Sequence, residues 1–450
     1  MLCHLAAYRI GAVIVPLFVQ FGADGLSFRL GDSGAKALIT DRQNLAKIDA
    51  IRDGLPDLAH VWSIDGPGDG AGDLHAALDA ARDTCPIVAT GPETPAFISY
   101  TSGTTGPPKG ARHAHRILPG HVPSTQLVHN FWPQEGDRIW TPSDWAWLGG
   151  LGNIMMPALR FGVPLIAHRA QRFDPEEAFR LMADQGVTNS FLAPTALKLM
   201  RQVPDPARFG LRIRSIASGG ESLGAAMLAW GQEALGLTIN EFYGQTESNP
   251  VLGSCADILP ARPGAMGKPI PGKHVVILRE DASLAAPGEA GEIAVRRGDP
   301  AMFLEYWNQP EKTAEKFVTA EDGHEYLLTG DVGETDEDGY FWFSSRTDDV
   351  ITSAGYRIGP SEIEDCLNRH PAVAMSACIG VPDEIRTEIV QAFVVLAGGQ
   401  NGSPDLAEAL KAHVRERLSP HVAPRIVDWI DEMPMTATGK IMRRVLRDRA

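Results

Sequence analysis

The chain has few cysteines and no excess of positive charge. Its five cysteines are scattered without a CxxC pair, and their number is odd (Cys3, Cys85, Cys255, Cys366 and Cys378). This spacing suggests neither a metal site nor a disulfide framework, and it favours reduced thiols in a cytoplasmic protein. The formal net charge of −15 argues against a nucleic-acid partner or a general anionic-membrane surface.

Long hydrophobic runs and internal repeats are also missing. The apolar stretch Ile10–Gly22 is interrupted by Gly11 and Pro16, and no basic cluster precedes it. It is too short to span a bilayer and makes a poor signal peptide, so we expect no transmembrane segment. The apolar share of 44% is ordinary for a globular protein, and 450 residues are enough for more than one domain.

A segment rich in glycine and hydroxyl side chains follows an apolar run, residues 96–100, that has the length of a buried strand. Glycines let backbone N–H groups converge on an anion, hydroxyls add donors, and a lysine adds positive charge. The segment is not a P-loop, which needs Gly-Lys-Ser/Thr, and Pro107-Pro108 argues against a flexible linker. We predict a polyphosphate loop formed by Thr101, Ser102, Gly103, Thr104, Thr105, Gly106 and Lys109.

Two further motifs carry the side chains of a nucleotide pocket. In the first, Glu241–Glu247, Tyr243 can stack on a purine and Thr246 can bond the α-phosphate. Glu247 is an oxygen ligand suited to Mg²⁺, which needs only one or two carboxylates. In the second, Thr329-Gly330-Asp331, the aspartate can accept both ribose hydroxyls. Each motif alone could be an ordinary loop with a capping or solvated acid.

The pattern of strands and helices predicts an α/β fold with two domains. From about Gly31 to Ile216 apolar strands alternate with amphipathic helices, which is typical of parallel sheets. We place an N-terminal domain at residues 1–347, with a small β subdomain at about 260–347, and a mobile α+β domain at 348–450. Expected local features include strands at 163–167, 189–192 and 213–217, a helix opened by Asp174, and a helix capped by Ser222 that ends at Gly236.

The order and spacing of these motifs resemble the adenylate-forming enzymes, which include acyl-CoA synthetases, adenylation domains of peptide synthetases, and luciferases. The matching segments are Tyr100–Gly110, Glu241–Glu247, Thr329–Asp331, Ser345–Asp349, Ser353–Arg357 and Pro434–Lys440. The resemblance implies an ATP or AMP site that also includes Gly220, Glu221, Gly244, Gln245, Arg346 and Arg357, a domain hinge at Asp348, and catalytic roles for Lys440, Thr246 and Glu247.

The same resemblance implies the chemistry. A carboxylate attacks ATP to give acyl-adenylate and pyrophosphate, with Mg²⁺ at Glu247, and a thiol then displaces AMP. The C-terminal unit is most similar to short- and medium-chain acyl-CoA synthetases, so the thiol is expected to be coenzyme A. The corresponding CoA-binding residues are Ala354, Gly355, Tyr356, Arg386 and Arg425.

The resemblance also places the acyl pocket at Trp147, Leu148, Gly149, Gly219 and Gly244. Acetate-restricted members carry a large aromatic residue where Gly244 stands, so we predict an acyl chain longer than acetate with an apolar tail. Chain-length preference should be graded, because each buried methylene contributes only about 0.8 kcal/mol.

Two alternatives remain. One is an acyl-AMP ligase that loads a separate carrier protein, and the other is a truncated, non-catalytic relative. The segment Ala6–Leu17 resembles an internal motif of the family, so the N-terminus is expected to be truncated or assigned late. Loss of strands from a parallel sheet would expose backbone edges, and we therefore expect poor solubility or weak activity.

Overall fold

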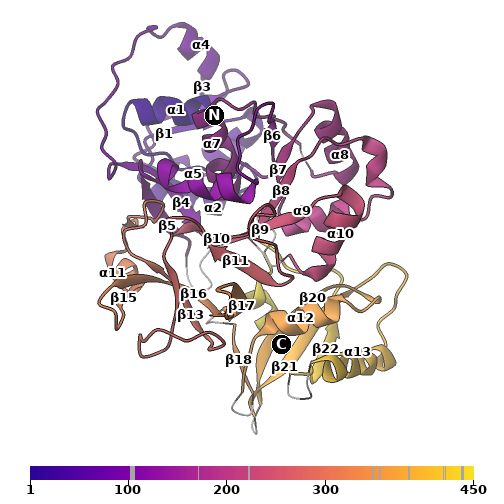
Figure 1. Ribbon diagram of the computed structural model, residues 1–450. Helices are drawn as coiled ribbons and strands as arrows, with labels where there is room; N and C mark the ends of the chain where they lie inside the picture. The colour runs from indigo at the N-terminus through magenta and orange to yellow at the C-terminus, as the bar shows by residue number, and fades with distance from the viewer. Residues whose placement is uncertain are drawn as a thin grey trace.

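The computed structural model shows a large N-terminal part and a small C-terminal unit, drawn in yellow in Figure 1. It describes residues 1–101, 107–170, 172–220, 223–346, 349–353, 356–383, 386–418, 420, 422–436 and 440–450; the side chains of residues 352, 356, 357 and 362 lie outside the description. Within these ranges no helix combines the length and apolar character needed to cross a membrane.

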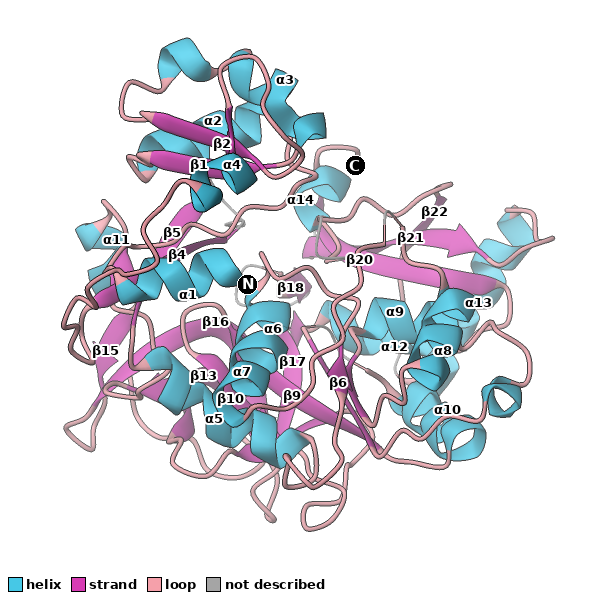
Figure 2. Ribbon diagram, turned by 90° about the horizontal axis from the view of Figure 1, so that it is seen from above, coloured by secondary structure: helices cyan, strands magenta, loops and turns pink. Residues whose placement is uncertain are grey.

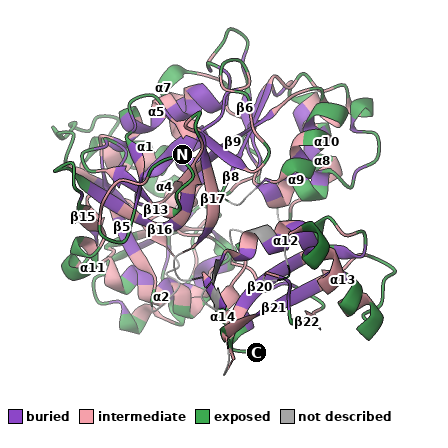
Figure 3. Ribbon diagram, turned by 60° about the horizontal axis from the view of Figure 1, so that its bottom comes forward, coloured by how far each residue is buried: buried purple, intermediate pink, exposed green. Residues whose placement is uncertain are grey.

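A sheet of 11 strands runs through the N-terminal part. One end of it is parallel and consists of β6 (Ile139–Trp140), β7 (Asn189–Phe191), β8 (Ser215–Gly219) and β9 (Ile239–Gln245). In this end of the sheet, β8 is buried throughout and β9 over its first four residues, which Figure 3 shows in purple. Buried parallel strands require cover on both faces.

Helices supply that cover. On one face lie α8 (Pro175–Asp184), α9 (Pro194–Met200) and α10 (Ala225–Leu235), which pack with β8 through Ile216. On the other face lie α5 (Ile117–Val128) and α7 (Met156–Phe161), which pack with β8 through Ala217. Successive strand residues point to opposite faces, so neighbours in one strand serve two separate cores.

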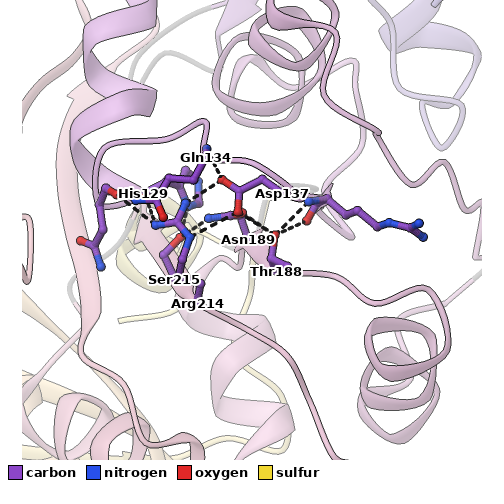
Figure 4. A network of polar contacts seen from close by, with 9 residues as sticks. His129, Gln134, Asp137, Thr188, Asn189, Arg214 and Ser215 are labelled. Carbon is purple, nitrogen blue, oxygen red and sulfur yellow. Dashed lines mark hydrogen bonds and ion pairs between the residues drawn. The ribbon is translucent and has the colours of Figure 1, made fainter.

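A buried polar network joins the amino ends of β6, β7 and β8 (Figure 4). Arg214 donates to both oxygens of Asp137, from Nη2 to Oδ2 at 2.7 Å and from Nε to Oδ1 at 3.3 Å. Asp137 also accepts from the Gln134 N–H and the Thr188 hydroxyl, at 2.7 and 3.1 Å. Ligands of open α/β sheets bind at the opposite, carboxyl ends of the strands, so we assign this network to stability.

Asp137→Ala should therefore destabilise the fold. The Asp137 side chain is 4% exposed, and its loss removes the ion-pair partner of Arg214 and the acceptor of the Gln134 N–H. We expect a loss of about 3 kcal/mol in the free energy of unfolding, measured by urea denaturation. The matched control is Asp53→Ala at an exposed position, which should change that free energy by less than about 0.5 kcal/mol. Equal effects of the two substitutions would contradict the assignment.

The β-rich segment continues the same sheet. β10 (Asn249–Gly253) turns back antiparallel to β9, and β11 (Ala265–Pro269) pairs with β10. The remaining strands follow in the order β17 (Phe341–Arg346), β16 (Glu325–Thr335), β13 (Gly291–Arg296) and β12 (Val275–Leu278), with β15 (Phe317–Thr319) beside β16. The ladder is continuous across β10 and β11, which places the carboxyl end of β9 beside β16 and β17.

Two smaller sheets complete the N-terminal part. Antiparallel strands β4 (Pro95–Thr101), β5 (Lys109–Ala114) and β14 (Glu305–Tyr306) flank the predicted phosphate loop. Parallel strands β1 (Ala37–Thr40), β2 (His60–Ser63) and β3 (Gly72–Asp73) form a separate lobe, where the helices labelled α2 (Ala23–Asp32), α3 (Leu45–Asp49) and α4 (Leu74–Asp79) lie beside them (Figure 2). The other helices of this part are α1 (Leu2–Arg9), α6 (Leu148–Gly150), a π-helix (Leu151–Met155), α11 (Pro310–Ala314), and the 3₁₀ turns Arg42–Asn44, Arg52–Gly54 and Pro206–Phe209.

The C-terminal unit is a sheet with helices. Its strands are β18 (Ile351–Ser353), β19 (Tyr356–Ile358), β20 (Val373–Asp383), β21 (Thr387–Leu396) and β22 (Ile426–Trp429). Two helices, α12 (Pro360–Asn368) and α13 (Pro404–Arg417), share one core with β20 and β21. The last helix, α14 (Arg443–Arg447), packs through Leu446 into a second cluster.

Most expected elements are confirmed, and two local predictions are wrong. Residues 163–167 form a single bridge, Leu165 to Ile139, instead of a strand. After α1, Gly11 turns the chain with φ +69°, and Ile14 forms a single bridge with Phe97 of β4. Ser222 lies outside the described residues, and α10 begins at Ala225 with Gly224 at the N-cap position. Asp174 caps α8 as expected, and Gly236 ends α10 in the left-handed conformation.

Candidate nucleotide and acyl site

The predicted ribose aspartate lies buried where β9, β16 and β17 meet. Asp331 is 6% exposed; its Oδ2 accepts from the Tyr243 hydroxyl at 2.6 Å and its Oδ1 from Arg346 Nη1 at 3.0 Å. The strand register explains the second contact, because Asp331 and Arg346 are direct partners across β16 and β17. Two residues expected to contact the nucleotide, Tyr243 and Arg346, therefore both donate to a third, Asp331.

Burial raises the pKa of Asp331, and nearby positive charges oppose the shift. Arg346 has the largest opposing effect, and Lys440 and Lys316 add to it. Lys440 belongs to the C-terminal unit, so its effect on Asp331 places the predicted catalytic lysine near the nucleotide residues. Its side chain is exposed, and its backbone N–H donates to the Thr436 hydroxyl at 3.0 Å.

The predicted Mg²⁺ ligand is a second buried carboxylate. Glu247 is 7% exposed, and its Oε1 accepts from the Tyr306 hydroxyl at 2.6 Å. The Phe303 N–H also donates to its backbone carbonyl at 2.8 Å. Among the described residues no three His, Cys, Asp or Glu side chains gather as a metal cluster. One buried carboxylate fits Mg²⁺, which relies largely on phosphate oxygens and water.

Two side chains connect this carboxylate with the other nucleotide residues. Lys109 Nζ lies 5.2 Å above the Tyr306 ring, which places the predicted loop lysine beside Glu247. Lys316 Nζ donates to the Leu328 carbonyl at 2.7 Å, and charges on Glu247, Glu292, Arg346 and Asp331 all act on it. The structure thus brings Lys109, Glu247, Asp331 and Arg346 to one site.

The end of β9 is held beside this site from two sides. Gln245 Nε2 donates to the Thr329 carbonyl at 3.0 Å, which ties β9 to the motif that carries Asp331. His113 of β5 is fully buried, stacks on Phe97 and lies against the backbone of Thr246. Burial lowers the pKa of His113 to about 3, so the ring is neutral. Thr246 and Lys109 are therefore held together by β5.

Sequence reasoning missed several residues that the structure places at the site. Tyr306, Lys316 and Glu292 lie in segments with no motif-like pattern. Strand pairing places Tyr306 beside β5, and it places Glu292 and the strand after Lys316 beside β16. A single lysine before an apolar strand carries no local signal. The predicted residues Ser102, Gly103, Thr104, Thr105, Gly106, Glu221, Asp348, Ala354 and Gly355 lie outside the described residues, as do the side chains of Tyr356 and Arg357.

The predicted acyl residues divide between two places. Trp147 and Gly149 form one group, because a Cβ at Gly149 would lie 2.8 Å from the Trp147 ring. Gly220, predicted as a nucleotide residue, lies beside the same ring, with its Cβ position 3.4 Å away. Leu148 lines a separate apolar cavity of about 110 Å³. The cavity is bounded by Tyr8, Ala96, Phe97, His115, Ile117, Leu118, His121, Leu148, Leu151, Gly152 and Met156.

Gly244 and Gly219 were expected to line the acyl pocket, but the structure gives another reason for glycine at both positions. A Cβ at Gly244 would lie 2.1 Å from the Asn249 carbonyl oxygen, and one at Gly219 would lie 2.6 Å from that of Phe242. Both glycines are required by the close approach of backbone. Gly244 is therefore not evidence for an open pocket floor, and the argument for a longer acyl chain depends on the cavity.

A buried histidine connects the cavity with the nucleotide motif. His121 Nδ1 lies 3.0 Å from Asn249 Oδ1, while the Asn249 amide nitrogen donates to the Ala301 carbonyl at 2.7 Å. This arrangement makes Nδ1 the donor, and Nε2 faces the Asn153 side chain in the π-helix. Burial lowers the pKa of His121 to about 4. Asn249 has φ +59° and stands two residues after Glu247, so the cavity wall is tied to the Mg²⁺ motif.

The predicted CoA arginines lie in the C-terminal unit. The Arg386 N–H donates to Asp383 Oδ1 at 2.8 Å, and the exposed Arg425 donates its N–H to the Val390 carbonyl at 2.8 Å. Arg386 is thus anchored through its backbone to the end of β20, and Arg425 to β21. Beside the predicted hinge, Asp349 accepts from Arg443 and Arg447 of α14, at 3.3 and 2.7 Å.

Comparison with known proteins gives a family for the whole chain. Residues 1–307 match the model of the AMP-binding enzyme family, and residues 362–440 match that of the AMP-binding enzyme C-terminal domain. An uncharacterized acyl-CoA ligase of Bacillus subtilis, YtcI, is 35% identical over 450 residues, which cover 99% of this chain and 82% of that protein.

Comparison with solved structures supports the same family. ATP-bound MatB from Rhodopseudomonas palustris has a TM-score of 0.87 and 29% identity, over 99% of this chain and 85% of that one. The anthranilate CoA ligase AuaEII in complex with anthranoyl-AMP has a TM-score of 0.89 and 28% identity, over 99% and 84%. The resemblance inferred from the motifs is confirmed: the chain belongs to the AMP-binding enzyme family of adenylate-forming enzymes, close to the acyl-CoA synthetases.

Proposed function

We propose that the chain is an AMP-forming acyl-CoA ligase that activates a small carboxylic acid with ATP and transfers the acyl group to coenzyme A. The observation that carries this proposal is the meeting of Lys109, Glu247, Asp331 and Arg346 at one site. These residues come from four strands or strand ends. In a protein of net charge −15, a local group of cations around buried carboxylates fits a nucleotide with a metal ion.

Each side chain has a role that follows from its chemistry. Asp331 accepts the ribose hydroxyls, because a carboxylate offers about four lone-pair sites and Tyr243 and Arg346 take two of them. Glu247 would hold Mg²⁺, which supplies charge neutralisation at the phosphates when bound. Thr246 donates to the α-phosphate. Lys440 stabilises the negative charge that develops as the carboxylate oxygen attacks phosphorus.

The acyl group is proposed to be aliphatic and longer than acetyl. The cavity beside Leu148 is lined almost wholly by apolar side chains, which suits an alkyl tail. Its volume of about 110 Å³ is smaller than the roughly 150 Å³ of an engineered cavity that binds benzene. A tail of a few carbons fits this space better than a phenyl ring does.

The test is pyrophosphate release with a panel of acids from acetate to octanoate, together with benzoate. We expect a graded rise from acetate towards acids of about four to six carbons, since each buried methylene contributes about 0.8 kcal/mol. Gly152→Ala should shift the preference to shorter acids, because the added Cβ meets His121 and Leu148 at 3.1 and 3.2 Å. Gly54→Ala, which adds its methyl group in open space, is the matched control.

Two results would contradict the proposal. A sharp acetate optimum would exclude a functional tail cavity. Acyl transfer to a carrier protein, without thioester formation on free coenzyme A, would instead support an acyl-AMP ligase. Arg386→Ala and Arg425→Ala separate the two thiols further, because they should raise the KM for coenzyme A and leave pyrophosphate release unchanged.

A further inference from the structure

The strand that carries Asp331 has an irregularity at the predicted ribose motif. Glu292 of β13 pairs with Val332 of β16, and Ala294 pairs with Leu328. Ile293 alone therefore stands opposite three residues, Thr329–Asp331. Bulges of this kind re-aim side chains and are over-represented next to active sites.

Side chains satisfy the backbone groups that the bulge displaces. The Thr329 hydroxyl donates to the Ile293 carbonyl at 2.7 Å, and the Gly330 N–H donates to Glu292 Oε1 at 2.7 Å. Gly330 has φ +78°, which favours glycine and turns the chain just before Asp331. Buried backbone N–H groups are rarely left without a partner, so the Glu292 acceptor helps to fix this turn.

The turn decides where the Asp331 carboxylate points. Asp331 follows Gly330 directly, and its two oxygens are aligned on Tyr243 and Arg346. Rotation of the Gly330 peptide would move the carboxylate away from both donors. A misplacement of about 1 Å can reduce a rate by roughly 10²-fold.

We propose that Glu292 is a positioning residue for nucleotide selection: through Gly330 it aims Asp331 at the ribose and so sets the preference for ATP over 2′-deoxy-ATP. This inference rests on the proposed function, because it takes Asp331 as the acceptor of the ribose hydroxyls. A site built to bond a hydroxyl group discriminates strongly against an analogue that lacks it.

The hydrogen bond can be separated from the charge of Glu292. Lys316 lies close enough for its charge to act on both Glu292 and Asp331. Gln at position 292 keeps an oxygen acceptor for the Gly330 N–H and loses the negative charge, whereas Ala loses both. We attribute the orientation of Asp331 to the oxygen that accepts from the Gly330 N–H and not to the negative charge. Glu292→Gln should therefore keep the preference for ATP over 2′-deoxy-ATP.

The experiment measures kcat and KM for ATP and for 2′-deoxy-ATP in pyrophosphate release. Glu292→Ala should raise the KM for ATP about tenfold and reduce the preference for ATP over 2′-deoxy-ATP by a similar factor. Glu292→Gln should retain the preference. Glu325→Ala, which removes an exposed acid of β16 that pairs with Arg297, is the matched control and should change neither quantity.

A double substitution tests the route through Asp331. Asp331→Ala should abolish most of the preference, and adding Glu292→Ala should reduce it no further, because residues that act through one another are not additive. Retention of the preference by Glu292→Ala, or its loss in Glu292→Gln, would overturn the inference and leave the proposed function intact. An unaltered protein that binds neither ATP nor AMP would overturn both.

Discussion

Replacement of Lys440 by alanine is expected to reduce acyl-adenylate formation by about 10²- to 10³-fold. The charge of this lysine acts on Asp331, although the two residues belong to different parts of the chain. In this arrangement the ammonium group lies near the nucleotide site, where negative charge grows as a carboxylate attacks the α-phosphorus.

The second half-reaction should be spared. Thioester formation from supplied acyl-AMP needs no charge stabilisation at a pentavalent phosphorus, so Lys440→Ala should retain most of that rate. The two steps are measured separately, by pyrophosphate release and by consumption of added acyl-AMP with coenzyme A. Lys411→Ala is the matched control, because Lys411 pairs with Glu408 on α13. Equal losses in both steps would contradict this division.

The position of the C-terminal unit is supported by contacts of its own. A Cβ at Gly359 would lie 2.4 Å from the Ser344 carbonyl oxygen of β17, so the two parts approach closely beside Arg346. Glu364 of α12 accepts from Arg443 at 2.7 and 2.8 Å, which ties α14 to α12. Arg443 and Arg447 of α14 also pair with Asp349, so both arginines are structural ion-pair partners within the C-terminal unit.

Much of the fold could be predicted because the local signals agree with the tertiary structure. The strand expected at residues 189–192 forms as β7 (Asn189–Phe191), and the helix opened by Asp174-Pro175 begins where its cap and proline place it. The predictions failed where pairing partners decide the outcome. Residues 163–167 are apolar enough for a strand, yet they form only one bridge, because a strand needs a ladder as well as a pattern.

The site residues also fall into two groups, those that sequence motifs identify and those that only the structure reveals. Motifs identify Glu247, Asp331 and Arg346, because their residue types suit the chemistry at fixed spacing. Tyr306 could not be found in this way, since it reaches the site through β14, which pairs with the distant strand β5. Lys316 stands just before β15, which pairs with the neighbouring β16, and a single lysine there forms no motif. Gly244 was interpreted from a family comparison as space for substrate, whereas the structure uses the glycine to let β10 approach.

Glu247→Gln should have the second largest effect, a loss of about 10²-fold in pyrophosphate release at fixed Mg²⁺. The glutamine is nearly isosteric and keeps an oxygen for the Tyr306 hydroxyl, so the fold should be unchanged. Glu247→Gln removes the negative charge that is proposed to bind Mg²⁺. The rate should therefore require a higher Mg²⁺ concentration, which a titration of initial rate against Mg²⁺ at constant ATP would measure.

The matched control is Glu241, at the other end of the Glu241–Glu247 motif. Glu241 is 7% exposed, and burial raises its pKa to about 8. At pH 7 the carboxyl group is therefore mostly protonated, and glutamine mimics the neutral form that accepts from the Leu223 N–H at 3.3 Å. Glu241→Gln should leave the rate and its Mg²⁺ dependence unchanged at that pH. If both substitutions reduced the rate equally, the loss at Glu247 would reflect damage to β9, and the metal role of Glu247 would have to be abandoned.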